Sequence, residues 1–235
     1  MPTSPASASG NAQTAPAYPQ VVTRTEWQRE RDALLQAEKE LTRARDALNA
    51  RRRRLPMVRI DTGYVFDSPR GPLKLIDLFE GRDQLVVYHN MLTADHICPG
   101  CSQVSDHLMN HWEHLHARRT SFCMTAHASL ERIEAVKARM GWTFPWVSCE
   151  HNRFHEDLVA AQNTPFGFLV FIQRGGEVFQ TWFTAGRGAE TPTNTFSMLD
   201  LTPWGRQESW EDSPPGWPQE PVYSWQRLHD EYGEV

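Results

Sequence analysis

The sequence has little that would place the protein in a membrane or in a small disulfide-bonded scaffold. No apolar run approaches the ~20 residues that a membrane-spanning helix needs. The first twenty residues have neither the basic start nor the apolar stretch of a secretory signal. Four cysteines in 235 residues are too few for a disulfide framework. We therefore expect a cytoplasmic protein with no membrane partner, in which a close cysteine pair serves redox chemistry or metal binding.

The composition is ordinary for a globular protein, with 40% hydrophobic and 23% charged residues. The net charge of −5 is uneven, because residues 24–54 carry ten basic and six acidic side chains. Four consecutive arginines at residues 51–54 could attract nucleic acid, but cations at a helix C-terminus also complement the helix dipole. We favour the second interpretation and expect no nucleic-acid partner.

Proline and glycine are absent from residues 24–54, where apolar residues recur at every seventh position. These residues are Trp27, Leu34, Leu41, Leu48 and Leu55. The spacing predicts one long amphipathic helix. Its apolar stripe can dock on its own domain or pair with a second copy in a coiled coil. We favour docking, or exchange of the helix at a dimer interface, so a homodimer through residues 24–54 is one expected assembly.

After this helix, short apolar runs alternate with helical patterns. Strands are predicted at residues 57–60, 64–66, 85–89, 121–126 and 144–147, with helices after the cysteine pair as far as Leu115, at 130–140 and at 196–201. Gly175-Gly176 predicts a hairpin between strands 166–172 and 177–183. Alternating strands and helices indicate an α/β domain with parallel crossovers, so the sheet is mixed. We divide the chain into a disordered tail (1–22), a helix (23–54), the α/β domain (55–206) and an irregular C-terminal extension (207–235).

Cys98-Pro99-Gly100-Cys101 lies between the strand at 85–89 and the start of a helix. Free backbone amides and the dipole at a helix N-terminus stabilise a thiolate there. We therefore predict that Cys98 is the more acidic, nucleophilic thiol and that Cys101 is the resolving thiol.

Several segments, read together with the cysteine pair, resemble one bacterial family. They are residues 55–59, 64–67, 77–81, 87–89, 141–148 and 199–203. The family is the thioredoxin-like one catalogued as domain of unknown function eight-nine-nine, and the resemblance covers about residues 27–206. It implies a thioredoxin or peroxiredoxin-type fold and makes Cys98 and Cys101 the working residues, but the family's name supplies no reaction. The stretch at residues 149–155 departs from the family pattern.

The resemblance also draws attention to Thr164-Pro165, directly before the hairpin. Thioredoxin-like folds place a cis-proline at this point, facing the cysteine pair, and proline is the residue that tolerates a cis bond at low cost. We expect a cis bond at Pro165, with the Thr164 backbone open to an extended thiol substrate. An ordinary turn proline is the alternative.

Histidines supply further candidate side chains. His89 ends the strand before the cysteine pair, as a core histidine or as a proton shuttle for Cys101. A metal site for copper or zinc would combine Cys98 and Cys101 with an imidazole. The candidate imidazoles are those of His107, His151 and His155. Of the remaining cysteines, Cys123 is expected to be a buried apolar residue, and Cys149 is either buried or a third redox thiol.

The leading functional prediction is a thiol–disulfide oxidoreductase, an enzyme that acts on a thiol or disulfide substrate and requires no cofactor. A metal-binding protein that uses the cysteine pair and histidine is the alternative. A specialised enzyme of small-molecule metabolism is a further one, because the fold alone does not determine the reaction.

Overall fold

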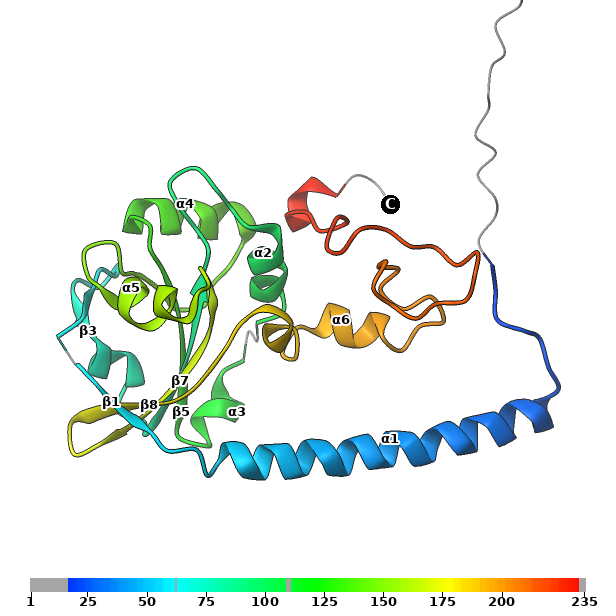
Figure 1. The fold of residues 1–235 in the computed structure, drawn as a ribbon. Helices are drawn as coiled ribbons and strands as arrows, with labels where there is room; N and C mark the ends of the chain where they lie inside the picture. The colour runs from blue at the N-terminus through cyan, green and yellow to red at the C-terminus, as the bar shows by residue number, and fades with distance from the viewer. Residues whose placement is uncertain (1–16, 62, 109–110, 233–235) are drawn as a thin grey trace, which may run out of the picture.

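Six strands form one mixed sheet in the computed structural model, which describes residues 17–61, 63–108 and 111–232. The strands are β1 (Val58–Ile60), β4 (Gln84–Asn90), β5 (Thr120–Ala126), β6 (Trp146–Ser148), β7 (Gly167–Arg174) and β8 (Glu177–Thr184), in the order β1-β8-β7-β4-β5-β6. Strands β4, β5 and β6 are parallel, whereas β7 pairs antiparallel with β4 and with β8. The predicted mixed sheet with flanking helices is confirmed (Figure 1).

Between β1 and β4 in the chain, strands β2 (Val65–Phe66) and β3 (Leu73–Lys74) pair antiparallel and form a small second sheet. A 3₁₀ turn, η1 (Leu75–Phe79), follows them and leads into β4. Two further 3₁₀ and helical turns, α5 (Phe154–Leu158) and η2 (Ala160–Gln162), lie between β6 and β7.

Each face of the sheet carries its own apolar core, because successive side chains of a strand point to opposite faces. One core joins Leu85 and Val87 of β4 to η1 and α5. The other core joins Tyr88 of β4 to α2 (Pro99–Asp106) and α4 (Leu130–Met140). Alternate residues of a central strand therefore face α2 and its cysteine pair, and the residues between them face the other core.

Helix α4 begins and ends where its sequence predicts. The Ser129 side chain accepts a hydrogen bond from the Arg132 amide at the N-terminus, and Gly141, with φ 66°, ends the helix in the left-handed conformation. These are the cap residues that such helix ends favour.

The predicted helix from the cysteine pair to Leu115 is wrong. Helix α2 ends at Asp106, and α3 (Glu113–His116) is a separate turn. Asp106 Oδ1 accepts from Trp142 Nε1 at 2.8 Å and lies 2.7 Å from His229 Nδ1, so the helix end is held by side chains distant in sequence. His107 is therefore the C-cap residue of α2, whereas His114 belongs to the separate turn α3.

Helix α1 (Arg24–Arg52) extends along one side of the molecule as a long arm (Figure 1). A capping box at Thr23 and Glu26 fixes its start. Among the described residues it buries none of its own side chains, and Leu41 is 71% exposed. The expectation that its stripe docks on its own domain is therefore wrong. At its C-terminal end, the Arg52 guanidinium lies 4.5 Å from the ring centre of Trp182.

Residues 186–232, which we call the C-terminal segment, pass over the end of α2. The segment contains η3 (Gly186–Ala189), α6 (Asn194–Leu199) and η4 (His229–Glu231), and is otherwise irregular. Glu208 and Leu228 are nonetheless buried in it. Of the expected disordered tail, residues 1–16 lie outside the described residues, whereas the Ala17 carbonyl accepts from Trp204 Nε1 at 2.9 Å.

No helix within the described residues combines the length and the apolar character that crossing a membrane requires.

Candidate active site

The cysteine pair lies at the start of α2, where Cys98 is the N-cap residue. The Cys98 sulfur accepts a hydrogen bond from the Cys101 amide at 3.4 Å, and Pro99 occupies the first turn. Proline is well suited to that turn, because its missing N–H would have no partner inside the helix. The sequence thus places one sulfur against the free amides of a helix start, which favours a negative charge there.

The two thiols differ in acidity. The pKa of Cys98 is lowered to about 6, above all by a hydrogen bond with the Cys101 thiol. Burial opposes this shift, whereas the Cys101 amide, the His96 side chain and the Gly100 amide add to it. The pKa of Cys101 is raised well above its ordinary value by its interaction with Cys98 and by burial. The two pKa shifts run in opposite directions, which makes Cys98 the more acidic of the two thiols.

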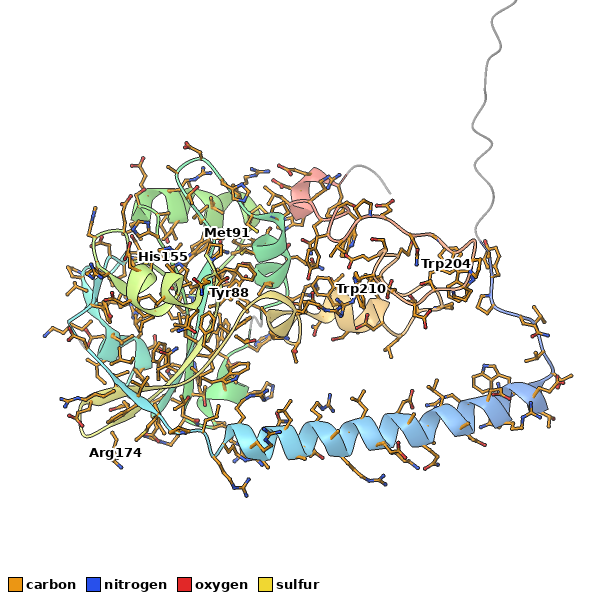
Figure 2. The ribbon with its side chains drawn as sticks, in the orientation of Figure 1. Tyr88, Met91, His155, Arg174, Trp204 and Trp210 are labelled. Carbon is orange, nitrogen blue, oxygen red and sulfur yellow. The ribbon has the colours of Figure 1, made fainter. Side chains whose placement is uncertain are left out.

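Tyr88 is a site residue that the sequence analysis missed. Its side chain lies on the α2 side of β4 (Figure 2) and is fully buried, and its hydroxyl makes no hydrogen bond of normal geometry to any of the described residues. The hydroxyl lies close enough to Cys101 to lower the pKa of that thiol, although burial and Cys98 outweigh this effect. Burial, followed by the charge on Cys101, raises the pKa of Tyr88 well above its ordinary value. Its position in an otherwise aliphatic run, one residue before His89, was the available signal.

A cavity of about 310 Å³ lies beside the cysteine pair. Both thiol residues line it, together with Tyr88 and Phe166 of the sheet domain. The C-terminal segment supplies the remaining wall, from Gly186 to Gln226. A Cβ on Gly100 would lie 3.1 Å from Gln226 Oε1, so glycine in the motif lets this wall approach closely. No pattern in the sequence indicates this wall, whose residues fall partly in the predicted α/β domain (55–206) and partly in the predicted irregular extension (207–235).

The expected cis bond at Pro165 is wrong, because every peptide bond among the described residues is trans. Thr164 Oγ1 donates to the Phe166 carbonyl at 3.0 Å, which turns the chain locally. Phe166, not Thr164 or Pro165, lines the cavity beside the cysteines.

His89 does not face Cys101. It lies on the opposite face of the sheet from Tyr88, next to α5, where its Nε2 is 2.9 Å from His155 Nδ1. Its other ring nitrogen is 2.9 Å from Thr125 Oγ1. Burial lowers the pKa of His89 to about 3, helped by His155 and His127. His89 is therefore a satisfied core histidine, the other of the two predicted roles.

The candidate metal ligands lie apart. His107 Nε2 contacts Thr195 Oγ1 of α6, His151 is exposed beside Glu150, and His155 belongs to the pair with His89. Over residues 17–61, 63–108 and 111–232, no group of three or more Cys, His, Asp or Glu side chains is arranged to hold a metal ion.

The other two cysteines lie in the core on the His89 side of the sheet. Burial raises the pKa of both Cys123 and Cys149 to about 12. Cys123 is the buried apolar residue that the sequence predicts, and Cys149 lies away from the Cys98 cavity.

Comparison with known proteins identifies one family model, described as a bacterial protein of unknown function (DUF899), which matches residues 16–232. No curated protein matches the chain significantly. Similar solved structures include a cysteine-to-serine mutant of PrxQ from Xylella fastidiosa, at 14% identity and a TM-score of 0.40, covering 60% of this chain and 94% of that one. Apo Sco1 from Thermus thermophilus has 11% identity and a TM-score of 0.34, covering 62% of this chain and 95% of that one.

Proposed function

The chain belongs to the bacterial DUF899 family, and from that premise we propose that it is a thiol–disulfide oxidoreductase of the cytoplasm. Cys98 is its nucleophile and Cys101 its resolving thiol. The observation that carries the proposal is the unequal acidity of two neighbouring thiols that line one cavity. The thiolate is the reactive form of cysteine, and a pKa of about 6 keeps Cys98 in that form at neutral pH.

The reaction follows from this difference. The Cys98 thiolate attacks one sulfur of a substrate disulfide, whose S–S bond breaks, and the first substrate thiolate leaves and takes a proton from water. Cys101 then gives its proton to solvent and attacks the Cys98 sulfur, which breaks the mixed disulfide and releases the second substrate thiolate, and this thiolate takes a proton from solvent. The products are two substrate thiols and a Cys98–Cys101 disulfide, and an external dithiol must return the two electrons.

Tyr88 supports the second step. When Cys101 ionises, its sulfur is buried and needs a hydrogen-bond donor in place of water. The Tyr88 hydroxyl, which makes no hydrogen bond of normal geometry within the part of the chain that the structure describes, is the donor available to that sulfur.

Replacement of each thiol tests the proposal. Cys98→Ser should abolish reduction of a model disulfide, whereas Cys101→Ser should trap the mixed disulfide, visible as added mass. Cys149→Ala is the matched control, because Cys149 lies in the core on the other side of the sheet. Unchanged turnover by Cys98→Ser would refute the proposal.

The proposed reaction uses no metal and no cofactor. Elemental analysis of reduced protein, purified without a histidine tag, tests this part separately. Stoichiometric copper or zinc that is lost in Cys98→Ser would favour the metal-binding alternative instead.

A further inference from the structure

The cavity beside Cys98 has the lining of a site for an apolar group. Apolar and aromatic side chains come from both of its walls. Tyr88, Val104 and Phe166 belong to the sheet domain, and Ala189 and Phe196 belong to the C-terminal segment. Ala189 and Phe196 are 3% and 4% exposed, so this wall is packed rather than loosely apposed.

Apart from the proposed Cys98 thiolate, Glu190 is the one charged side chain among the described residues that line the cavity, and its charge is already balanced. Its Oε2 accepts from Arg206 at 2.7 Å, and its Oε1 accepts from the Tyr223 hydroxyl. Arg206 is itself held by Asp200 at 2.7 Å. No lysine or arginine is therefore available in this lining to bind a substrate carboxylate.

The wall is also fixed over α2. Gln226 Nε2 donates to Gln103 Oε1 at 2.5 Å, and His229 contacts Asp106 at the end of the helix. A substrate must therefore place a small group between α2 and the C-terminal segment to bring its sulfur to Cys98.

We propose that the substrate is a low-molecular-weight disulfide with uncharged apolar or aromatic substituents. This inference rests on the proposed oxidoreductase function. One substituent of the disulfide occupies the cavity while Cys98 attacks the sulfur that carries it. The reaction is the one given above, with two substrate thiols and a Cys98–Cys101 disulfide as products. A disulfide with carboxylate groups, such as glutathione disulfide, is disfavoured because it would bury negative charge beside Glu190. The two nearby guanidiniums, those of Arg206 and Arg187, lie outside the cavity lining and are already within ion-pair distance of Glu190.

The experiment compares two aromatic disulfides on reduced full-length protein: uncharged dipyridyl disulfide and dianionic dithiobis(nitrobenzoate). Each rate is divided by the rate of the same reagent with a simple thiolate, which removes intrinsic reactivity. We expect a preference of about tenfold or more for the uncharged reagent, the size of effect that one apolar contact surface provides. Alkylation of Cys98 by iodoacetamide, which is small enough to need no cavity, measures the thiolate independently.

Two variants keep the test decisive. Ala189→Phe fills the cavity and Phe196→Ala removes part of its wall, and each should lower the preference while leaving alkylation within about twofold. Equal normalised rates in the wild type, with normal alkylation, would overturn the substrate class alone. No reaction with either disulfide would overturn the proposed function as well.

A separate observation concerns α1, whose apolar stripe is exposed although it follows a strict heptad spacing. With Leu34, Leu41 and Leu48 at position a of the heptad, Ala37 and Ala44 fall at position d. This is the pattern of a coiled-coil seam. The helix spans 29 residues, or about 43 Å, which is long enough for four heptads.

The charges beside the seam select its partner. In a parallel, in-register pair, position g of one helix meets position e of the next heptad on the other helix. Glu40 then meets Arg45, and Glu26 meets Arg31, while Ala33 and Ala47 stand opposite the remaining charges. Two attractive pairs and no like-charge pair result on each side. We infer that a second copy of this chain covers the stripe, parallel and in register.

Sedimentation of the full chain tests this inference. We expect a dimer for the wild type and for Lys39→Glu, which changes the outer face of α1, and a monomer for Leu34→Glu combined with Leu41→Glu. A monomeric wild type, or a dimer that survives both leucine changes, would overturn it.

Charge reversal then tests the orientation. Glu40→Arg or Arg45→Glu alone should raise the dissociation constant about fivefold through like-charge contacts. An equimolar mixture of these two variants should restore dimerisation as a heterodimer. Failure of the mixture to recover would overturn the parallel register.

Discussion

His155 Nδ1 lies 2.9 Å from Nε2 of His89, so two imidazoles from α5 and β4 share one hydrogen bond behind the central sheet. Their rings are stacked at 4.9 Å, and His127 stacks on His155 at 5.3 Å. Glu156, 3.8 Å from His127, is the carboxylate at the outer end of this stack. A proton added to His89 would therefore create a buried charge beside two other imidazoles.

The first prediction is loss of stability in mild acid. His89 has a pKa of about 3 when folded, so it stays neutral, whereas the unfolded residue takes up a proton below about pH 6.5. The stability that the folded protein gains from a neutral, buried His89 is present above that pH and is lost as the pH falls. Lowering the pH from about 7 to about 5 should therefore lower the free energy of unfolding by about 2 kcal/mol through His89.

Urea denaturation at the two pH values measures this loss. His89→Gln should reduce the pH dependence by that amount, whatever its effect on stability at neutral pH. His151→Gln is the control, because His151 is exposed. An unchanged slope in His89→Gln would show that this histidine is already protonated in the folded protein.

The second prediction concerns the acidity of Cys98. Its alkylation rate should rise with pH through a midpoint of about 6, as the thiol becomes thiolate. Cys101→Ala removes the largest cause of the lowered pKa and should move the midpoint upward. Iodoacetamide labelling followed by mass spectrometry gives both midpoints, and equal midpoints would assign the acidity to the helix start alone.

The third prediction separates attack from resolution. Tyr88→Phe removes the hydroxyl that stabilises the Cys101 thiolate but retains the buried ring. The mixed disulfide on Cys98 should therefore persist about tenfold longer, the effect of one lost hydrogen bond to a charged group. Rapid quench and mass analysis measure its decay. The first step, release of one substrate thiol, should keep its wild-type rate, and an unchanged decay would remove Tyr88 from the mechanism.

The fourth prediction concerns the attachment of the C-terminal segment. Arg206 is buried between Glu190 and Asp200, and its replacement leaves the Glu190 carboxylate with only the more distant, exposed guanidinium of Arg187, at 3.7 Å. Arg206→Ala should cost about 3 kcal/mol of stability, the range for breaking a buried ion pair. Limited proteolysis should then cut within residues 200–226 earlier than in the wild type. Arg118→Ala, at an exposed arginine, is the matched control.

Much of the fold could be predicted because the signals are local. Helix α4 has a serine at its start, a glycine at its end and an apolar periodicity between them, and the β7–β8 hairpin has two consecutive glycines. The prediction that Cys98 is the more acidic thiol rests on its place at a helix start, whereas the largest cause of its lowered pKa in the structure is the hydrogen bond with the Cys101 thiol.

The errors arise where distant residues decide the structure. The sequence predicts either of two places for His89, because successive side chains of a strand point to opposite faces of the sheet. A shift of one position therefore decides whether Tyr88 or His89 faces the cysteine pair. The wall beside the cysteines depends on contacts such as that of Tyr223 with Glu190, which leave no periodic trace in the sequence. The stripe of α1 was recognised, but periodicity alone does not identify the surface that covers it.

The attachment of Ala17 to the C-terminal segment gives α1 a second anchor. The helix is tied to the sheet through β1 at one end and, through Ala17 and Trp204, to the chain that forms the cavity wall at the other (Figure 2). Because α1 connects these two attachment points, its length sets the distance between β1 and the Ala17–Trp204 hydrogen bond. Inserting or deleting a helical turn should separate Ala17 from Trp204, so the length of α1 and the position of the C-terminal segment have to agree.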